Sequence, residues 1–374
     1  MPWVRLLREH GYKVYAVVPS GLWNEKIEDG GAEIVEWKLT RSGRNPFLEF
    51  ASIVGLTRIL RRIKPDVIQN FHTKPNIYAP IAAHLARVPV SVSTVTGLGY
   101  TFVKRTGFES KIATQLNLQM YSFANRFVDQ IAFQNPDDMK LLRNRAGLPD
   151  SKGKFIPGGS GVDVNEYTPE SRKSRESLEI RNSLGISAAK FVVMFVGRLQ
   201  LDKGLVEFVK AARLLKKKRD DIVFVMVGAP DPGNKRSVSE SRLARWKSEG
   251  DVVFTGRSED VPKLMAMANT VTTPSFYKEG MPRTLLEAAA TGLPLIGTDI
   301  PGVREAIIDG VNGILIPIQD PLALATAVEE IADDRSKAER YGLASLERAI
   351  NEFDHRRVVG EYMKMYEELW LKRG

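Results

Sequence analysis

The 374-residue chain contains no cysteine and no apolar run long enough to cross a membrane. The lack of thiols excludes disulfides, thiolate-bound iron–sulfur centres and cysteine nucleophiles, and it fits a reducing compartment. The longest apolar run, around residues 191–196, has the length of a strand, whereas a spanning helix needs about 18 residues. An Asp-x-Asp pair, which could hold a divalent ion, is also missing. We therefore expect neither a metal nor another cofactor.

Acidic residues are scarce in the first half of the chain. Residues 1–165 contain 22 Lys and Arg against 14 Asp and Glu, whereas residues 166–374 are nearly balanced with 32 against 31. Such a bias attracts an anionic partner: acidic lipid headgroups, a pyrophosphate-bearing acceptor or nucleic acid. A solvated basic face is the alternative for any single cluster. Because no nucleic-acid motif accompanies the charge, we expect no nucleic-acid partner.

Strand and helix patterns alternate along most of the chain. In the first half, β-branched runs at 12–18, 66–71, 90–95 and 129–134 are separated by helical patterns at 45–64, 75–87 and 108–127. In the helix predicted at 45–64, Asn45 is the expected N-cap, and four apolar residues follow at helical spacing: Phe47, Phe50, Val54 and Ile59. This alternation predicts βαβ units and a doubly wound α/β fold with a parallel sheet.

The second half repeats the arrangement. Strands are predicted at 191–196, 222–227, 252–255, 270–273, 295–297 and 314–316, and residues 321–373 are almost wholly helical. The joint is expected within the glycine-rich and then polar segment 158–175. We therefore predict an N-terminal domain at 1–165, a C-terminal domain at 166–353 and a final helix at 354–374. That helix has an apolar stripe formed by Tyr362, Met365, Tyr366 and Leu369, and we expect it to cross back to the first domain.

The start of the chain departs from the usual order of such a domain. A helical pattern at 3–10 leads directly into the strand at 12–18, whereas a doubly wound domain opens with a strand and a glycine-rich turn. We therefore expect a first domain that is truncated and lacks its opening strand.

The stretch EGMPRTLLEAAATGLP at 279–294 carries chemical information. Pro282 stands where a helix should begin, and Gly280 before it lets a ligand approach. Free amides at a helix start form an anion site suited to a diphosphate. Glu279 before the helix and Glu287 within it could each accept hydrogen bonds from sugar hydroxyls. The alternative is a capped amphipathic helix with two exposed glutamates.

The stretch VGRLQLDKG at 196–204 places Arg198 and Lys203 in a loop after a strand. In open α/β sheets, ligands bind beyond the carboxyl ends of the strands. Two fixed cations there could neutralise a leaving diphosphate without a metal. They could also be ordinary surface cations.

These motifs, in this order, resemble the retaining nucleotide-sugar glycosyltransferases of family 4 over essentially the whole chain. The resemblance rests on GGSGVD (158–163), VGRLQLDKG, FTGR (254–257), EGMPRTLLE and TDIPGVREAIIDGVNGILIP (298–317). It implies the GT-B fold, with two Rossmann-like domains facing a cleft. In the first half, the segment NFHTKPNIYAPIAAHLARVPV, followed by TVTGLGYTF (70–102), looks like enzymes that extend polyprenyl-diphosphate-linked glycans for capsule, O-antigen or N-glycan assembly.

The resemblance also implies partners and roles for individual residues. The donor would be a nucleotide sugar, often a UDP-N-acetylhexosamine, and the acceptor a polyprenyl-diphosphate-linked glycan at the cytoplasmic face of an anionic membrane. Arg198 and Lys203 would hold the donor diphosphate, Glu279 and His72 would meet the reacting sugar, and Glu287 would bind the ribose. The remaining expected donor contacts are Gly197, Arg257 at the base, Gly280, Met281, Pro282, Thr284 and Leu285. The expected contacts on the acceptor side are Thr96, Gly97 and Gly99, although those glycines could simply form a turn.

Family members of this kind retain the anomeric configuration, and the resemblance implies front-face departure of the nucleotide diphosphate. Three alternatives stay open on the sequence. A sugar-nucleotide epimerase shares the architecture but needs no basic first domain. A non-catalytic binding protein would follow if the shortened first domain could not close. A nucleic-acid binder would explain only the charge.

Overall fold

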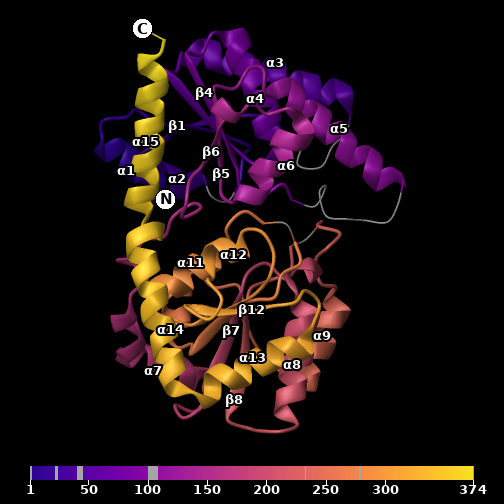
Figure 1. Cartoon of the computed structure of the whole chain (residues 1–374), viewed down its shortest axis with the longest axis vertical. Coiled ribbons are helices and arrows are strands. Elements are labelled where there is room, and N and C mark those ends of the chain that lie inside the picture. Colours follow the sequence, from indigo (N-terminus) through magenta and orange to yellow (C-terminus); the bar gives the residue numbers. More distant parts are fainter. Residues whose placement is uncertain are drawn as a thin grey trace. The chain divides into compact units, whose positions relative to one another are not determined.

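A computed structural model describes residues 2–21, 24–39, 45–99, 108–231, 233–277 and 279–373, with residues 108–111 and 173 described by their backbone alone. The chain forms two compact units (Figure 1). Unit 1 comprises Met1–Gly159 and His355–Gly374, and unit 2 comprises Ser160–Asp354. The chain therefore first passes from unit 1 to unit 2 after Gly159, inside the segment 158–175 where the sequence predicts the joint.

Unit 1 alternates strands with helices. Its elements are α1 (Pro2–Glu9), β1 (Tyr15–Val18), α2 (Asn24–Asp29), β2 (Glu33–Glu36), α3 (Pro46–Ile63), β3 (Val67–Phe71), α4 (Thr73–Ala86), β4 (Val90–Val95), α5 (Phe108–Ala124), β5 (Gln130–Phe133), α6 (Pro136–Ala146), β6 (Gly153–Phe155) and α15 (His355–Leu371). Every strand pair is parallel.

Two of the apolar clusters in unit 1 show how its strands are covered. In one cluster, residues of α3 and α4 pack on Trp37, with Val17 of β1 and Ile68 of β3 at its margin. The other cluster joins Val90 and Val92 of β4 to α15. The strands therefore lie between two layers of helices, as the predicted doubly wound fold requires.

Helix α3 begins as predicted but presents an unexpected face to the core. Asn45 is its N-cap, and the side chain accepts a hydrogen bond from the Phe47 amide at 3.0 Å. The buried face is formed by Ser52, Leu56, Thr57 and Leu60, while Phe47 and Phe50 are 84% and 68% exposed. The apolar spacing that begins at Phe47 therefore marks the helix but not its core face.

Helix α15 belongs to unit 1 although it follows all of unit 2 in sequence. Its stripe residues Tyr362, Met365 and Tyr366 are buried, with Leu369 at the margin of the same cluster. The Tyr362 hydroxyl lies 3.0 Å from the Thr94 hydroxyl, and the Tyr366 hydroxyl donates to the Gln69 side chain at 3.0 Å. These contacts join the last helix to β3 and β4, along which it lies in yellow in Figure 1.

Unit 2 continues the alternation. Its elements are α7 (Arg175–Ser183), β7 (Phe191–Val196), a 3-10 turn η4 (Leu201–Lys203), α8 (Leu205–Lys216), β8 (Ile222–Val227), α9 (Glu240–Glu249), β9 (Val253–Gly256), α10 (Val261–Ala266), β10 (Thr270–Thr273), α11 (Arg283–Ala290), β11 (Leu295–Thr298), α12 (Val303–Ala306), β12 (Gly313–Ile316), α13 (Pro321–Asp333) and α14 (Arg335–Arg348). Among the described helices of both units, none is long and apolar enough to cross a membrane.

The strands of unit 2 form one six-stranded parallel sheet in the order β12-β11-β10-β7-β8-β9. A large buried apolar cluster lies on each face of this sheet. Because all strands run in the same direction, the loops that follow β7, β8, β9 and β10 meet at one edge of the sheet. This edge contains the predicted donor-binding residues.

The two units differ at the centre of their sheets. In unit 2, β7 lies between β8 and β10, whereas the described strands of unit 1 form two separate sheets, β1-β2 and β3-β4-β5-β6. If the strands are matched by their order along the chain, β1 corresponds to β8 and β3 to β10, and these two strands lie on either side of β7 in unit 2. Among the described residues of unit 1, no strand pairs between β1 and β3. The prediction that the first sheet lacks a strand present in the second is confirmed for the described residues.

Candidate active site

Lys203 and Glu279 form the central ion pair at the carboxyl edge of the unit 2 sheet. Lys203 ends η4 after β7, and Glu279 lies in the loop after β10. Their side chains are 2.6 Å apart, from Nζ to Oε2, and are only 18% and 15% exposed. The second oxygen of Glu279 accepts a hydrogen bond from the Ser275 hydroxyl at 3.0 Å. Lys203 and its partner are therefore held in place, and neither is an ordinary surface charge.

A second layer of charges joins the loops after β7 and β8. Arg198 Nη1 lies 3.2 Å from Asp231 Oδ2, and its side chain remains 60% exposed. Arg236 is paired with Asp202 at 2.8 Å. Its guanidinium lies 4.9 Å from the ring centroid of Tyr277, and the Lys203 ammonium lies 5.8 Å from the same centroid. Two cations, Lys203 and Arg236, therefore lie beside one aromatic ring at this edge, and each of the three cations is held in place by a carboxylate.

Helix α11 starts at the same edge. Pro282 precedes it and, because its side chain has no polar atom, supplies no side-chain cap. The Thr284 hydroxyl donates to the Val196 carbonyl at 3.2 Å, which ties the first turn to the end of β7. The Leu285 amide is already used, since it donates to the Pro282 carbonyl at 3.0 Å.

Gly302 allows another loop to pack against this helix start. A Cβ atom at Gly302 would lie 1.3 Å from the Gly280 carbonyl oxygen, so no other residue fits there. The TDIPG motif therefore positions the backbone of the EGMP motif, although the two are separated by a whole helix and strand.

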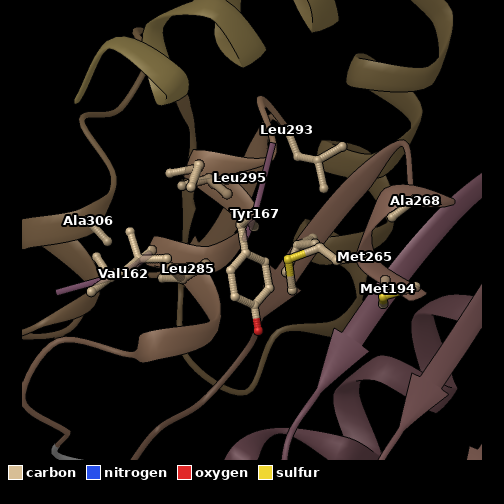
Figure 2. Packing of buried hydrophobic residues seen from close by; sticks show 14 of the residues in the cluster. Val162, Tyr167, Met194, Met265, Ala268, Leu285, Leu293, Leu295 and Ala306 are labelled. Carbon is tan, nitrogen blue, oxygen red and sulfur yellow. The ribbon is translucent and has the colours of Figure 1, made fainter. Parts of the chain in front are cut away.

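Glu287 lies inside α11 and is buried beneath this edge. Its carboxylate is paired with Arg283 at 2.9 Å and hydrogen-bonded to the Tyr167 hydroxyl. The ring of Tyr167 packs among Met265, Leu285 and other members of the apolar cluster, with the hydroxyl at its outer end (Figure 2). The alternative of a helix with two exposed glutamates is therefore wrong.

Burial makes the Glu287 carboxylate easier to protonate. Desolvation raises the pKa of Glu287 above the usual glutamate value, while Arg283 and the Tyr167 hydrogen bond oppose the rise. Burial and the neighbouring Glu287 raise the pKa of Tyr167 as well, which keeps its hydroxyl a proton donor. A carboxylate that is buried in spite of this desolvation penalty is typical of a functional site, because its burial does not stabilise the fold.

Unit 1 has a smaller polar group of its own at the ends of β3 and β4. His72 precedes α4, and its Nδ1 lies 3.1 Å from the Thr96 hydroxyl. His72 has a φ of 71°, a left-handed conformation that is uncommon for a residue with a side chain and that often marks a functional site. Gly97 and Gly99 have φ values of 98° and 70°, so both glycines are needed for the turn itself. Residues 100–102, which end the segment TVTGLGYTF, lie outside the described residues.

The other predicted residues of unit 2 follow the strands of the same sheet. Gly197 follows β7 directly, Arg257 follows β9 with an exposed side chain, and Met281 is buried before α11. Five residues that were not predicted contact predicted ones: Tyr167, Asp231, Ser275, Tyr277 and Arg283. Of these, Ser275 and Tyr277 could have been noticed as polar residues between β10 and Glu279. Among the described residues, no group of three His, Asp or Glu side chains is placed to hold a metal ion.

Two Rossmann-like units, with cations and carboxylates gathered at the carboxyl edge of the second sheet, form the architecture of the GT-B fold. Residues 176–348 match the family model "Glycosyl transferases group 1", and residues 1–135 match "Glycosyl transferase 4-like". The chain belongs to this family of glycosyltransferases.

Similar proteins include two bacterial enzymes. The chain is 25% identical over 369 residues to the N,N'-diacetylbacillosaminyl-diphospho-undecaprenol alpha-1,3-N-acetylgalactosaminyltransferase of Campylobacter jejuni, covering 99% of this chain and 94% of that one. It is 27% identical over 289 residues to the UDP-Gal:alpha-D-GlcNAc-diphosphoundecaprenol alpha-1,3-galactosyltransferase of Escherichia coli, covering 77% and 71%.

A solved structure has the same fold. The Anabaena protein HepE in complex with UDP and glucose superposes with a TM-score of 0.80 at 20% sequence identity, and the match covers 97% of this chain and 94% of that one.

Proposed function

We propose that the protein transfers a hexose or N-acetylhexosamine from a UDP-sugar to a polyprenyl-diphosphate-linked glycan, with retention of anomeric configuration, at the cytoplasmic face of a membrane. The observation that carries the proposal is the Lys203–Glu279 pair, 2.6 Å apart and mostly buried at the carboxyl edge of the unit 2 sheet. An ammonium and a carboxylate fixed side by side can hold a diphosphate and a sugar hydroxyl at adjoining positions.

In this proposal, each predicted residue of unit 2 binds one part of the donor. Lys203 and Arg198 neutralise the diphosphate, and Glu279 accepts hydrogen bonds from the sugar. Glu287 accepts hydrogen bonds from the ribose hydroxyls, and Arg257 contacts the base. The backbone at 280–281 and the first turn of α11 add amide donors near the phosphates.

The chemical step breaks the bond between the sugar C1 and the diphosphate oxygen and forms a bond from C1 to the acceptor oxygen. Retention follows when the acceptor attacks from the face that the diphosphate leaves, and the acceptor proton then passes to the departing phosphate oxygen. Negative charge grows on the diphosphate as the bond breaks, and Lys203 and Arg198 stabilise that charge in a preorganised position. His72 of unit 1 is assigned to the reacting sugar.

Two observations support the acceptor and the stereochemistry. The relatives from Campylobacter jejuni and Escherichia coli are both named for diphospho-undecaprenol acceptors and for alpha-1,3 linkages. UDP-galactose is itself an α-glycoside, so an α product means retention. The same names favour sugar transfer over the epimerase alternative. The basic excess in residues 1–165 suits an acceptor anchored in an anionic bilayer.

The test is a transfer assay with a panel of UDP- and GDP-sugars and a diphospho-undecaprenol-linked N-acetylhexosamine acceptor. We expect product from a UDP-sugar, with an α-anomeric coupling in the NMR spectrum of the new linkage. The Lys203→Ala variant is the control for contaminating activity. A β linkage would remove the retaining mechanism, and the lack of transfer from every donor by the folded protein would refute the proposed function.

A further inference from the structure

One face of helix α3 is turned to solvent and is strongly apolar at its start. Phe47 and Phe50 are 84% and 68% exposed, and Val54 is half-buried one turn further along. Large apolar side chains are costly to leave in water, and two neighbouring exposed phenylalanines on one helix are more than the scattered apolar residues of an ordinary surface.

The same face becomes basic toward the end of the helix. Residues 47, 50, 54, 58 and 61 follow one another at spacings of three and four, so Arg58 and Arg61 continue the stripe that Phe47 begins. Arg58, Arg61 and the adjacent Arg62 are all exposed. The Arg61 guanidinium also donates to the Leu85 carbonyl at 3.0 Å, which holds it close to the end of α4.

The exposed face of α3 carries no carboxylate. Glu49 is the only acidic residue of α3, and it is turned toward α4, where it pairs with Lys74 at 2.6 Å and is 14% exposed. A helix face with aromatic residues, arginines and no acidic group is complementary to an anionic lipid surface, because its arginines can meet headgroup phosphates while its rings enter the interface.

Helix α4 runs beside α3, and α5 has exposed apolar side chains of its own. The contacts of Glu49 with Lys74 and of Arg61 with Leu85 show that α3 and α4 run side by side in the same direction. Tyr121 of α5 is hydrogen-bonded to Thr73 and Asn76 at the start of α4.

The ring of Phe127, which follows α5, lies 4.9 Å from that of His84 near the end of α4. The earlier part of α5 therefore extends past the start of α4. There Ile112 and Leu116, one turn apart, are 53% and 54% exposed.

We propose that this lipid-docking face, formed by Phe47, Phe50, Val54, Arg58 and Arg61 of α3, binds the surface of an anionic phospholipid bilayer. It deepens the proposed function, which requires an acceptor held in a membrane. The aromatic rings enter the interface, and the arginines contact lipid phosphates.

The test is vesicle flotation of the full chain with phosphatidylcholine vesicles, with and without phosphatidylglycerol. We expect binding that requires phosphatidylglycerol and weakens with salt. The double variant Phe47→Ser/Phe50→Ser should lower the partition coefficient by about 10²-fold, and Arg58→Gln/Arg61→Gln should lower it by about tenfold.

Matched controls come from unit 2. Leu322→Ser/Leu343→Ser removes two exposed apolar side chains of α13 and α14, and Arg335→Gln/Arg340→Gln removes two exposed charges of α14. Neither should change vesicle binding. Wild-type binding by the phenylalanine variant, with an unchanged circular dichroism spectrum, would overturn the proposal. So would a wild-type dimer in light scattering that becomes monomeric in that variant, because the face would then bind a second copy.

Transfer assays separate this proposal from the proposed function. With a short-chain, water-soluble diphosphate-linked acceptor, Phe47→Ser/Phe50→Ser should transfer sugar at the wild-type rate. With a polyprenyl-linked acceptor in vesicles, it should be slower in proportion to its lost binding. If the wild-type protein binds vesicles but transfers no sugar to either acceptor, the docking face stands and the proposed function fails.

Discussion

The Lys203 ammonium lies 2.6 Å from the Glu279 carboxylate, although the two residues follow different strands of the unit 2 sheet. The carboxylate is fixed on its other side by the Ser275 hydroxyl at 3.0 Å. The lysine therefore keeps its position before a donor arrives, and its charge needs no reorganisation during bond cleavage.

Lys203→Ala should reduce kcat/KM by about 10²–10³-fold and leave the fold intact, because removal of one preorganised charge from a leaving group typically has that effect. The measurement is steady-state kinetics with the preferred UDP-sugar. Lys210→Ala, at an exposed position on the neighbouring helix α8, is the matched control. A near-normal kcat/KM in Lys203→Ala would remove this lysine from the site.

Arg198→Ala should also slow transfer strongly. Arg198 is held by Asp231 at 3.2 Å but is 60% exposed, so its position depends on that one carboxylate. Asp231→Asn should therefore produce a smaller loss in the same direction, because the arginine keeps its charge and loses its orientation. Equal rates in Asp231→Asn and the wild type would show that the donor alone orients Arg198.

Transfer should be insensitive to chelation. Two cations at the diphosphate position can take the charge that a divalent ion would otherwise neutralise. We expect unchanged initial rates with EDTA and no gain on adding Mn²⁺. Activity that vanishes with EDTA and returns with Mn²⁺ would contradict the metal-free mechanism.

Tyr167→Phe should weaken donor binding through Glu287. The hydroxyl supports the ionised carboxylate, so its loss raises the pKa of Glu287 further and loosens its orientation. The donor KM should rise about tenfold with little change in kcat. In a pH series, the KM should begin to rise at a higher pH than in the wild type as the solution is acidified. Tyr341→Phe, at another buried tyrosine of unit 2, is the control.

Glu287→Gln should make the folded protein more stable at neutral pH while it impairs donor binding. Because the folded-state pKa of Glu287 is raised, the native state binds this proton more readily than the unfolded chain. The ionised carboxylate therefore costs stability above its raised pKa, and the cost vanishes as the pH falls below the ordinary glutamate value of 4.5.

The gain in Tm of Glu287→Gln should accordingly be largest near pH 7–8 and should disappear near pH 4. Differential scanning calorimetry of wild type and variant across that range is the measurement. A variant that is less stable than the wild type at neutral pH would mean that the Arg283 and Tyr167 contacts outweigh the desolvation of the carboxylate.

The strands of the second half could be located from the sequence because they are buried on both faces. β7, β8 and β10 begin and end at the predicted residues, since long β-branched runs bounded by polar residues admit few alternatives. β2 and β6 were missed. β2 is four residues long with charged residues at both ends, and β6 is three residues long and begins with glycine, so neither has a distinctive pattern.

Helix α3 shows where a local pattern misleads. Its position, its Asn45 cap and its length follow from the sequence, yet its exposed face is the one that carries Phe47 and Phe50. Which side of a helix is buried depends on what packs against it, and α4 contacts the side with Leu56 and Leu60.

The sequence by itself determined the fold class, the family and the order of the glycosyltransferase motifs, because strand periodicity and motif residues are properties of short segments. Only the tertiary structure decided the contacts between those segments. Tyr167 meets Glu287, Lys203 meets Glu279 and α15 packs on β4, each across a long stretch of chain. The Lys203–Glu279 pair forms because parallel strands bring distant loops to one edge of a sheet, and no local pattern encodes which distant segments will be neighbours.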